Sequence, residues 1–273
     1  MRKWLNIFFA IGILLCAVAW KGWGPGGNRI HRPLVSGGAA PPLDTGTPIL
    51  WYDFEGTNAT QTLDISGNNN HGSNLPSVAT GPTWVNTNGT FYSWDGVDDN
   101  GFNAGSISQT TPSTLGISVW VRTRHDSQPA AYVNRWSYTA GLKSFYLFKD
   151  GIVTYNLYFA LYQPNDALVE CNVSNLTAAF WGTNPGLWHH LGVVADGTNI
   201  FVYIDGTNKV STTYNGTIDT NNAPVMIGSL YPDGLYRATD GIDDARYFAS
   251  LTTQQLINIF NSTKTNAPYF FAP

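Results

Sequence analysis

Hydrophobic and polar residues alternate along much of the chain after residue 48, and the alternation has a period of two. The clearest run covers residues 117–122, where Ile117, Val119 and Val121 fall on one face. Successive side chains of a β-strand point to opposite sides, so this pattern predicts a strand with one buried face. Further hydrophobic runs, several bounded by turn sequences, predict strands at residues 49–54, 91–94, 145–148, 152–162, 188–195, 200–204, 209–213, 224–228 and 242–248.

Turn sequences indicate how these strands are connected. Lys-Asp-Gly at residues 149–151 predicts a hairpin, and Asp-Gly pairs at 196–197 and 205–206 predict two further turns. Asp-Gly suits tight antiparallel turns, which need residues that tolerate a positive φ. The segment 188–213 is therefore expected to be an antiparallel meander. Residues 57–89, rich in Asn, Gly, Pro and Ser, are expected to be mostly loop with short strands.

One helix is predicted, near the C-terminus. Thr252 and Gln255 have the spacing of a capping box, in which each side chain bonds the backbone N–H of the other residue. Leu256, Ile259 and Phe260 follow at the i, i+3, i+4 spacing of an amphipathic helix. We expect this helix to pack its apolar face against the strands.

Composition narrows the fold class and the partners. Hydrophobic residues make up 43% of the 273 residues and charged residues only 12%. This apolar content excludes intrinsic disorder, and the 14% of aromatic residues favours strands. The net charge of −4 lacks the basic balance of a nucleic-acid-binding domain. The chain is therefore expected to be all-β, a sandwich or barrel with no nucleic-acid partner.

The N-terminal region differs from the rest of the chain. A basic start, an apolar stretch and a small-residue cleavage sequence predict a secretory signal peptide at residues 1–19, with an uncleaved signal anchor as the alternative. Residues 20–48 are rich in Gly and Pro and are expected to be a linker. The folded domain is expected at 49–273, secreted or on an extracytoplasmic surface, and at a membrane only if the anchor stays uncleaved. After cleavage Cys171 is the only cysteine, so no intrachain disulfide is expected.

Six segments in the predicted domain together resemble a known family. They are residues 51–56, 64–72, 94–99, 117–122, 188–191 and 241–247. Their order resembles the laminin-G-like, concanavalin A-like lectin/glucanase jelly roll over nearly the whole chain after the linker. The resemblance implies a sandwich of two antiparallel sheets with one short C-terminal helix. The segment 124–183 is longer and more aromatic than in compact members of that family.

The resemblance also implies a calcium site. Related sandwiches carry one structural Ca²⁺ near the first strand, the following loop and the last strand, which here corresponds to Asp53, Asp64 and Asp243. The loop after the first strand contains Asp, Ser and Asn oxygens of the kind that bind Ca²⁺, but the same residues also form turns in which side chains bond their own backbone. For Asp244, the sequence favours a structural pair with Arg246 on the same strand face.

Four aromatic residues are candidate ligand contacts. Trp136, Tyr138, Tyr231 and Tyr236 lie in predicted loops flanked by Gly or Asn. Amphipathic rings in such loops can stack on sugars or on a protein partner. A chain with so many aromatic residues also exposes some of them without a function.

The catalytic motif of related enzymes is missing. The jelly roll that this chain resembles also occurs in glycoside hydrolases, whose active strand has a Glu-x-Asp-x-Glu pattern that aligns two carboxylates on one face. This chain has only Glu55 and Glu170, far apart and in no such run. His189 and His190 are expected on opposite faces of a strand, one packed and one exposed, which argues against a shared metal.

The sequence therefore predicts a secreted or surface-tethered, non-catalytic recognition module. A glycan is the leading ligand class, and a surface protein is the second. Two alternatives remain open: a structural or protein-interaction component of an envelope or viral particle, and a divergent glycoside hydrolase of the same fold.

Overall fold

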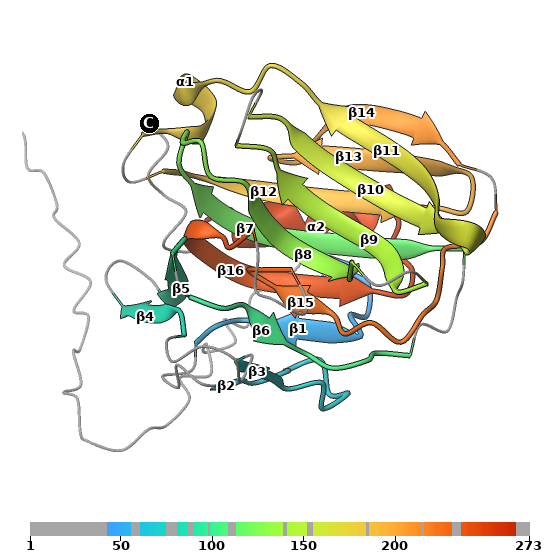
Figure 1. Cartoon of the computed structure of the whole chain (residues 1–273), viewed down its shortest axis with the longest axis horizontal. Helices are drawn as coiled ribbons and strands as arrows, with labels where there is room; N and C mark the ends of the chain where they lie inside the picture. The colour runs from blue at the N-terminus through green and yellow to red at the C-terminus, as the bar shows by residue number, and fades with distance from the viewer. Residues whose placement is uncertain are drawn as a thin grey trace, which may run out of the picture. The chain divides into compact units, whose positions relative to one another are not determined.

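Two β-sheets packed face to face account for most of the described chain in the computed structural model (Figure 1). The structure describes residues 43–55, 61–74, 81–86, 90–97, 99–108, 113–138, 141–151, 155–183, 186–214, 216–230 and 236–265. The predicted signal peptide at 1–19, most of the predicted linker and Tyr231 lie outside these ranges. Within these ranges, no helix has the length and apolar character needed to cross a membrane.

The first sheet has the strand order β14-β13-β12-β7-β16-β5-β4, with β1 also paired to β16, and all its pairings are antiparallel. Its strands are β1 (Leu50–Tyr52), β4 (Thr83–Asn86), β5 (Thr90–Asp95), β7 (Leu115–Thr123), β12 (Leu187–Ala195), β13 (Asn199–Ile204), β14 (Thr207–Thr213) and β16 (Thr239–Phe248). The meander predicted at 188–213 is confirmed, because β12, β13 and β14 pair in chain order.

The second sheet, also antiparallel, has the order β11-β10-β9-β8-β15-β6-β3-β2. Its strands are β2 (Gln61–Thr62), β3 (Gly72–Asn74), β6 (Phe102–Asn103), β8 (Ala130–Trp136), β9 (Lys143–Lys149), β10 (Leu157–Gln163), β11 (Ala167–Val173) and β15 (Met226–Ile227). A 3₁₀ turn, η1 (Pro164–Asp166), joins β10 to β11, and the short helix α1 (Ala178–Trp181) follows β11. The expected all-β jelly-roll sandwich with a short C-terminal helix is therefore confirmed.

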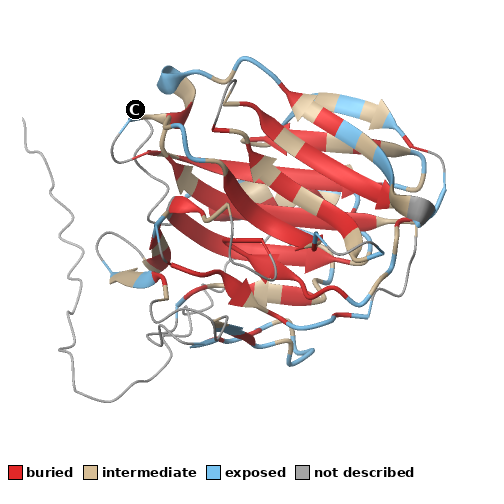
Figure 2. Ribbon diagram, in the orientation of Figure 1, coloured by how far each residue is buried: buried red, intermediate tan, exposed pale blue. Residues whose placement is uncertain are grey.

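The hydrophobic core lies between the two sheets, where the central strands are almost wholly buried (Figure 2). Ile117, Val119 and Val121 of β7 are fully buried in it, as their alternation predicts. Phe145 and Leu147 of β9 contribute from the second sheet. Burial of such side chains stabilises the folded state by about 1.5–3 kcal/mol each, so this interface provides the main driving force for folding.

The C-terminal helix α2 (Thr253–Thr263) begins with the predicted capping box. Thr252 Oγ1 accepts a hydrogen bond from Gln255 N–H at 3.2 Å, and Thr252 N–H donates to Gln255 Oε1 at 2.9 Å. Asp44 joins the N-terminal segment to this helix: its carboxylate accepts from Gln255 Nε2 at 2.9 Å and its carbonyl from Asn258 Nδ2 at 2.7 Å. The end of the predicted linker therefore contacts α2, so the folded unit begins before residue 49.

Helix α2 packs on the outer face of the first sheet, where two glycines allow a close approach. A Cβ added to Gly116 of β7 would lie 2.3 Å from Leu251 Cβ, just before the helix. A Cβ added to Gly192 of β12 would lie 2.6 Å from Leu256 Cδ2. Larger residues at either position would force the helix away from the sheet, so these glycines are required for packing.

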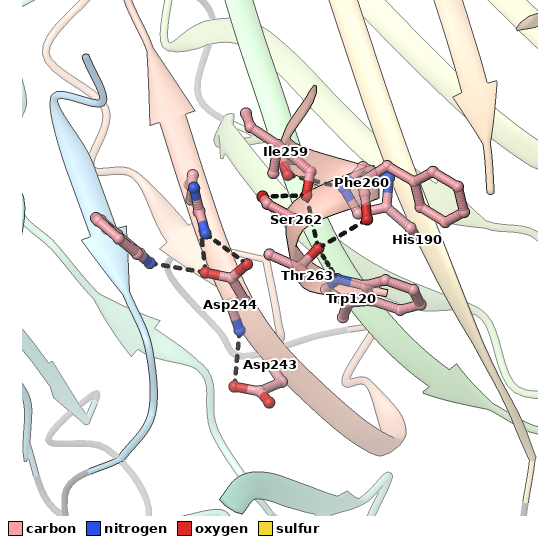
Figure 3. Close-up of polar contacts among 11 residues, drawn as sticks. Trp120, His190, Asp243, Asp244, Ile259, Phe260, Ser262 and Thr263 are labelled. Carbon is pink, nitrogen blue, oxygen red and sulfur yellow. Dashed lines mark hydrogen bonds and ion pairs between the residues drawn. The ribbon is translucent and has the colours of Figure 1, made fainter. Parts of the chain in front are cut away.

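His190 of β12 lies beneath α2 on this outer face (Figure 3). Its Nε2 is 2.9 Å from Ser118 Oγ, and the rings of Trp120 and Phe260 pack against it. Trp120 Nε1 donates to Thr263 Oγ1 at 2.9 Å, which fixes the end of the helix above this cluster.

His189 points to the opposite face, as predicted from the strand period. It stacks on Phe180 with ring centroids 3.9 Å apart, and its Nδ1 is 2.7 Å from Asp205 Oδ2. The expectation that one of the two histidines is exposed is wrong: both are buried, because α2 covers the outer face.

The buried imidazole of His190 should make stability depend on pH. Burial lowers the pKa of His190 to about 3, an effect that nearby Asp205 opposes and Arg246 reinforces. In the unfolded chain a histidine has a pKa of about 6.5, so below that pH unfolding takes up a proton and stability falls. Relative to a His190→Gln variant, the wild type should lose about 2 kcal/mol of unfolding free energy between pH 7 and pH 5.

Urea unfolding at the two pH values measures this difference. The Ser118→Ala variant is the control, because it removes the hydroxyl partner but keeps the buried imidazole. It should be less stable than the wild type at both pH values. Its unfolding free energy should change between pH 7 and pH 5 by the same amount as that of the wild type. An equal change of unfolding free energy with pH in the wild type and in His190→Gln would contradict the prediction.

Candidate functional site

Seven side chains line a pocket of about 240 Å³ at the second sheet. They are Trp136, Tyr138, Tyr146, Phe148, Tyr162, Leu230 and Tyr236. All except Leu230 are aromatic. Pockets for drug-sized ligands have roughly 300–1,000 Å³, so this pocket suits a single ring-sized group. We refer to these seven residues as the aromatic pocket.

Strand geometry directs the rings of β9 and β10 to the outer face of this sheet. Phe145 and Leu147 point into the core, so the alternate residues Tyr146 and Phe148 point outward. Tyr146 pairs across the strands with Ala160 of β10, and residues opposite each other share a face. Tyr162, two positions after Ala160, therefore extends the same aromatic surface.

Trp136 enters the pocket at the end of β8. A register shift between Arg135 and Trp136 interrupts the pairing with β9 at this point, and such irregularities re-aim side chains. The ring of Trp136 contacts Tyr138 with centroids 4.6 Å apart and Tyr146 with centroids 6.2 Å apart, both in edge-on geometry. Its indole Nε1 is buried and has no hydrogen-bond partner among the described residues. Tyr138 is 51% exposed and forms the solvent-facing side of this group.

Tyr236 closes the other side of the pocket from a constrained backbone position. Its φ is 52°, in the left-handed region that bulky residues rarely adopt. Its carbonyl accepts a hydrogen bond from Ala131 N–H of β8 at 2.7 Å, which anchors this conformation to the sheet. The Tyr236 ring then meets Phe148 edge-on, with centroids 5.3 Å apart. Strained residues of this kind cluster at functional sites.

Charged and hydroxyl groups lie beside the rings. Lys143 Nζ is 3.4 Å from Asp166 Oδ2 and 5.6 Å from the centroid of the Tyr162 ring. The Tyr146 hydroxyl donates to Glu170 Oε1 at 3.5 Å. Burial raises the pKa of Tyr146, and the nearby Tyr162 and Glu170 add to this effect, so its hydroxyl is a neutral donor at ordinary pH. The pocket therefore combines apolar ring surface with polar groups at its edge.

The structure brings together three of the four aromatic residues singled out in the sequence. Trp136, Tyr138 and Tyr236 all line the pocket, although they are up to 100 positions apart in the chain. Tyr231 lies outside the described residues. The sequence interpretation missed the strand residues of the pocket, which are Tyr146, Phe148 and Tyr162, and also Leu230. Residues 145–148 are all hydrophobic, so their sequence pattern carries no signal that Tyr146 and Phe148 face outward.

Asp64, one of the three predicted calcium ligands, organises the loop after β2. Its Oδ1 accepts hydrogen bonds from the backbone N–H groups of Trp51 at 3.0 Å and Ser66 at 2.9 Å. Its Oδ2 accepts from Asn70 N–H at 2.9 Å. Both carboxylate oxygens thus bond backbone donors, which is the turn interpretation that the sequence left open.

The other two predicted ligands make local contacts as well. Asp53 Oδ1 accepts from Glu55 N–H at 3.4 Å, and Asp243 Oδ1 accepts from Asp244 N–H at 2.8 Å. Burial raises the pKa of Asp53, against the lowering effect of the Glu55 N–H. Among the described residues, no three Asp, Glu, His or Cys side chains converge as a metal site would require. Asp53, Asp64 and Asp243 therefore do not fit the predicted calcium site.

Asp244 instead forms a buried ion pair with Arg246, as predicted (Figure 3). Arg246 Nε and Nη2 donate to the two carboxylate oxygens of Asp244 at 2.9 and 2.8 Å. Trp51 Nε1 of β1 also donates to Asp244 Oδ1 at 2.7 Å, and the Arg246 guanidinium lies 4.1 Å from the centre of the Trp51 ring. Burial raises the pKa of Asp244, and the Arg246 guanidinium opposes the shift. This cluster is structural and ties β1 to β16.

Comparison with protein families agrees with this architecture. A family model described as the concanavalin A-like lectin/glucanases superfamily, of the laminin G type, matches residues 95–258. The chain belongs to the concanavalin A-like lectin/glucanase superfamily. The resemblance inferred from the six sequence segments is thereby confirmed. No curated protein sequence matches this superfamily member.

Solved structures of the same fold include toxin binding domains. One is the binding domain of Paraclostridial mosquitocidal protein 1, with 17% identity, a TM-score of 0.61, and coverage of 81% of this chain and 53% of that one. Another is the botulinum neurotoxin type G receptor-binding domain, with 14% identity, a TM-score of 0.56, and coverage of 80% and 51%. A third is the binding domain of botulinum neurotoxin DC in complex with SialylT, with 13% identity, a TM-score of 0.59, and coverage of 80% and 51%. The superfamily member spans about half of each structure, and at these identities the similarity establishes the fold.

Replacing Asp64 should destabilise the protein without involving a metal. The Asp64→Ala variant leaves three backbone N–H groups without their acceptor, and hydrogen bonds to a charged group contribute about 1.5–3 kcal/mol. We expect urea unfolding to show a loss of at least about 1.5 kcal/mol, with a smaller loss for Asp64→Asn, which keeps one acceptor oxygen. Asp53→Ala is the matched control and should lose less, because Asp53 accepts a single long bond.

The same samples test the calcium expectation. A ligand that binds only the folded state raises the melting temperature. We expect neither added Ca²⁺ nor a chelator to change the melting temperature of the wild type. A calcium-dependent rise that both the Asp53 and Asp64 variants abolish would restore the predicted site.

Proposed function

We propose that this protein is an extracytoplasmic, non-catalytic recognition module that binds glycans in the aromatic pocket. The observation that carries the proposal is the preformed cluster of six aromatic rings on the outer face of the second sheet. A module of this kind needs a rigid site, and here the strands and the anchored Tyr236 backbone hold the rings in place before any ligand arrives.

The chemistry of the pocket matches a sugar ring. One face of a pyranose presents C–H groups that can bury against aromatic surface, while its hydroxyls need hydrogen-bond partners. Trp136 and Tyr138 supply apolar ring surface, and Tyr146, Lys143 and Glu170 supply donors and acceptors at the edge.

Structural relatives support a binding role. They are binding domains, one solved in complex with SialylT and another, of botulinum neurotoxin serotype D, in complex with N-acetylneuraminic acid. The similarity is one of fold, so it supports recognition by this superfamily member without naming its ligand.

A non-catalytic role is supported by the positions of the two glutamates. Glu170 lies on β11 of the second sheet, whereas Glu55 directly follows β1 of the first sheet. Retaining glycoside hydrolases need two carboxyl groups about 5–5.5 Å apart on one active face. The two glutamates do not share a strand or a sheet, so they do not form such a pair. The extracytoplasmic location is supported by the signal-like sequence at residues 1–19.

Removing rings from the pocket should weaken glycan binding. An aromatic contact of this kind contributes about 0.5–1.5 kcal/mol, so Tyr138→Ala and Trp136→Ala should each reduce affinity about threefold to tenfold. Tyr158→Ala is the matched control, because Tyr158 lies on the same outer face of β10 but does not line the pocket. Binding is measured first on a glycan array and then by calorimetry with the best ligand.

Three results would contradict the proposal. They are the absence of any glycan binding by the wild type, a loss of affinity in the control as large as in the pocket variants, and full affinity in the pocket variants. Cleavage of the bound glycan would indicate a divergent hydrolase. Binding of an extended peptide in place of any sugar, lost in the same variants, would identify a protein partner.

A further inference from the structure

The ammonium group of Lys143, beside the aromatic pocket, is already paired. Lys143 lies over the Tyr162 ring, with its Nζ 5.6 Å from the ring centroid, and the same Nζ is 3.4 Å from Asp166 Oδ2. Both side chains are only partly exposed, so the pair is held in place rather than fully solvated. A ligand carboxylate at this edge would compete with Asp166 for the one ammonium group.

A further carboxylate lies on the outer face of the second sheet, where Glu170 pairs across the strands with Ala160. Glu170 is exposed, and its Oε1 accepts from the Tyr146 hydroxyl at 3.5 Å. Asp219 lies near Tyr162, because its backbone N–H donates to the Tyr162 carbonyl at 2.8 Å, but the positive charge of Arg135 acts on its carboxylate. Among the described residues beside Tyr146 and Tyr162, Glu170 and Asp166 therefore set two negative charges against the single charge of Lys143.

Neighbouring arginines do not reverse this balance. Arg135 is 3% exposed, and its Nη2 donates to the carbonyl of Asn221 instead of facing the rings. Arg237 follows Tyr236 in the chain, but it is not among the lining residues and its Nε is buried. The described charges beside Tyr146 and Tyr162 therefore have a negative sum.

We infer that the aromatic pocket selects uncharged sugar rings and rejects sugars that carry a carboxylate. This inference rests on the proposed glycan function and adds the ligand class. A neutral sugar ring can stack on Trp136 and donate a hydrogen bond from one of its hydroxyls to Glu170, whose carboxylate is a strong acceptor. A sialic or uronic acid would place its own negative charge beside Glu170 and Asp166, and like charges at an interface oppose binding.

The test uses pairs of sugars that differ only in charge. The probes are the methyl glycosides of glucose and galactose and of the corresponding uronic acids, and affinities for the full protein are measured by ligand-observed NMR titration. We expect each neutral glycoside that binds to do so at least about threefold more tightly than its uronic acid. Raising the salt concentration from about 10 mM to about 1 M shortens the screening length from about 30 Å to about 3 Å, so it should narrow this difference.

Glu170→Gln identifies the group responsible. Glutamine keeps an acceptor oxygen and removes the charge, so uronic acid binding should strengthen at least twofold while neutral sugar binding changes less. Glu55→Gln is the matched control, because it changes the net charge equally at an exposed position that follows β1 in the other sheet. It should leave both affinities unchanged.

The outcomes separate this inference from the proposed function. If the uronic acids bind as tightly as the neutral sugars or more tightly, the charge selection is wrong and the glycan site stands. An equal response of the Glu55 and Glu170 variants also overturns the selection, because net charge would then explain it. If no sugar of either kind, nor any glycan on the array, binds the wild type, the proposed function fails and the inference fails with it.

Discussion

The first sheet depends on a single irregularity in β16, which must pair with three other strands. One edge of β16 pairs with β7, while its other edge pairs with β5 through residues 239–242 and with β1 through residues 245–247. The register with β7 shifts between Asp243 and Arg246, and Asp244 takes a φ of 44° there. An extra residue of this kind bends a strand and re-aims its side chains.

The side chain of Asp244 adds a second connection between β1 and β16, besides their backbone pairing. Asp244 reaches both Arg246 of its own strand and Trp51 of β1, so one carboxylate serves the ion pair and the indole N–H. Breaking a buried pair by removing one partner costs about 3–5 kcal/mol, because the remaining charge is left buried. The irregularity and the ion pair therefore support each other: the positive φ positions the carboxylate, and its three hydrogen bonds offset the strain.

How far the fold was predictable from the sequence depends on where the period of two persists. It persists in β7, which is predicted from it, whereas the β12-β13-β14 meander is predicted from its Asp-Gly turns. It fails in β8, whose residues were not assigned to a strand, because register shifts after Ala131 and Arg135 break the alternation. The edge strand β11 was missed for another reason: its exposed residues have no steady apolar face. The helix was predictable because a capping box is a local signal. Burial of His190 beneath that helix depends instead on the close approach of the helix to Gly116 of β7 and Gly192 of β12, which are far from it in sequence.

The candidate site follows from an asymmetry between the two sheets. Helix α2 covers the outer face of the first sheet, and there even His190 is fully buried. On the second sheet the outward side chains of β9 include Tyr146 and Phe148, which remain partly exposed beside Trp136. In sequence, the β9 run reads as continuously hydrophobic, which is equally typical of a strand buried on both faces. Only the tertiary arrangement distinguishes these cases. The described fold covers the outer face of the first sheet with a helix but leaves these rings of the second sheet partly exposed. The rings therefore remain available for a ligand.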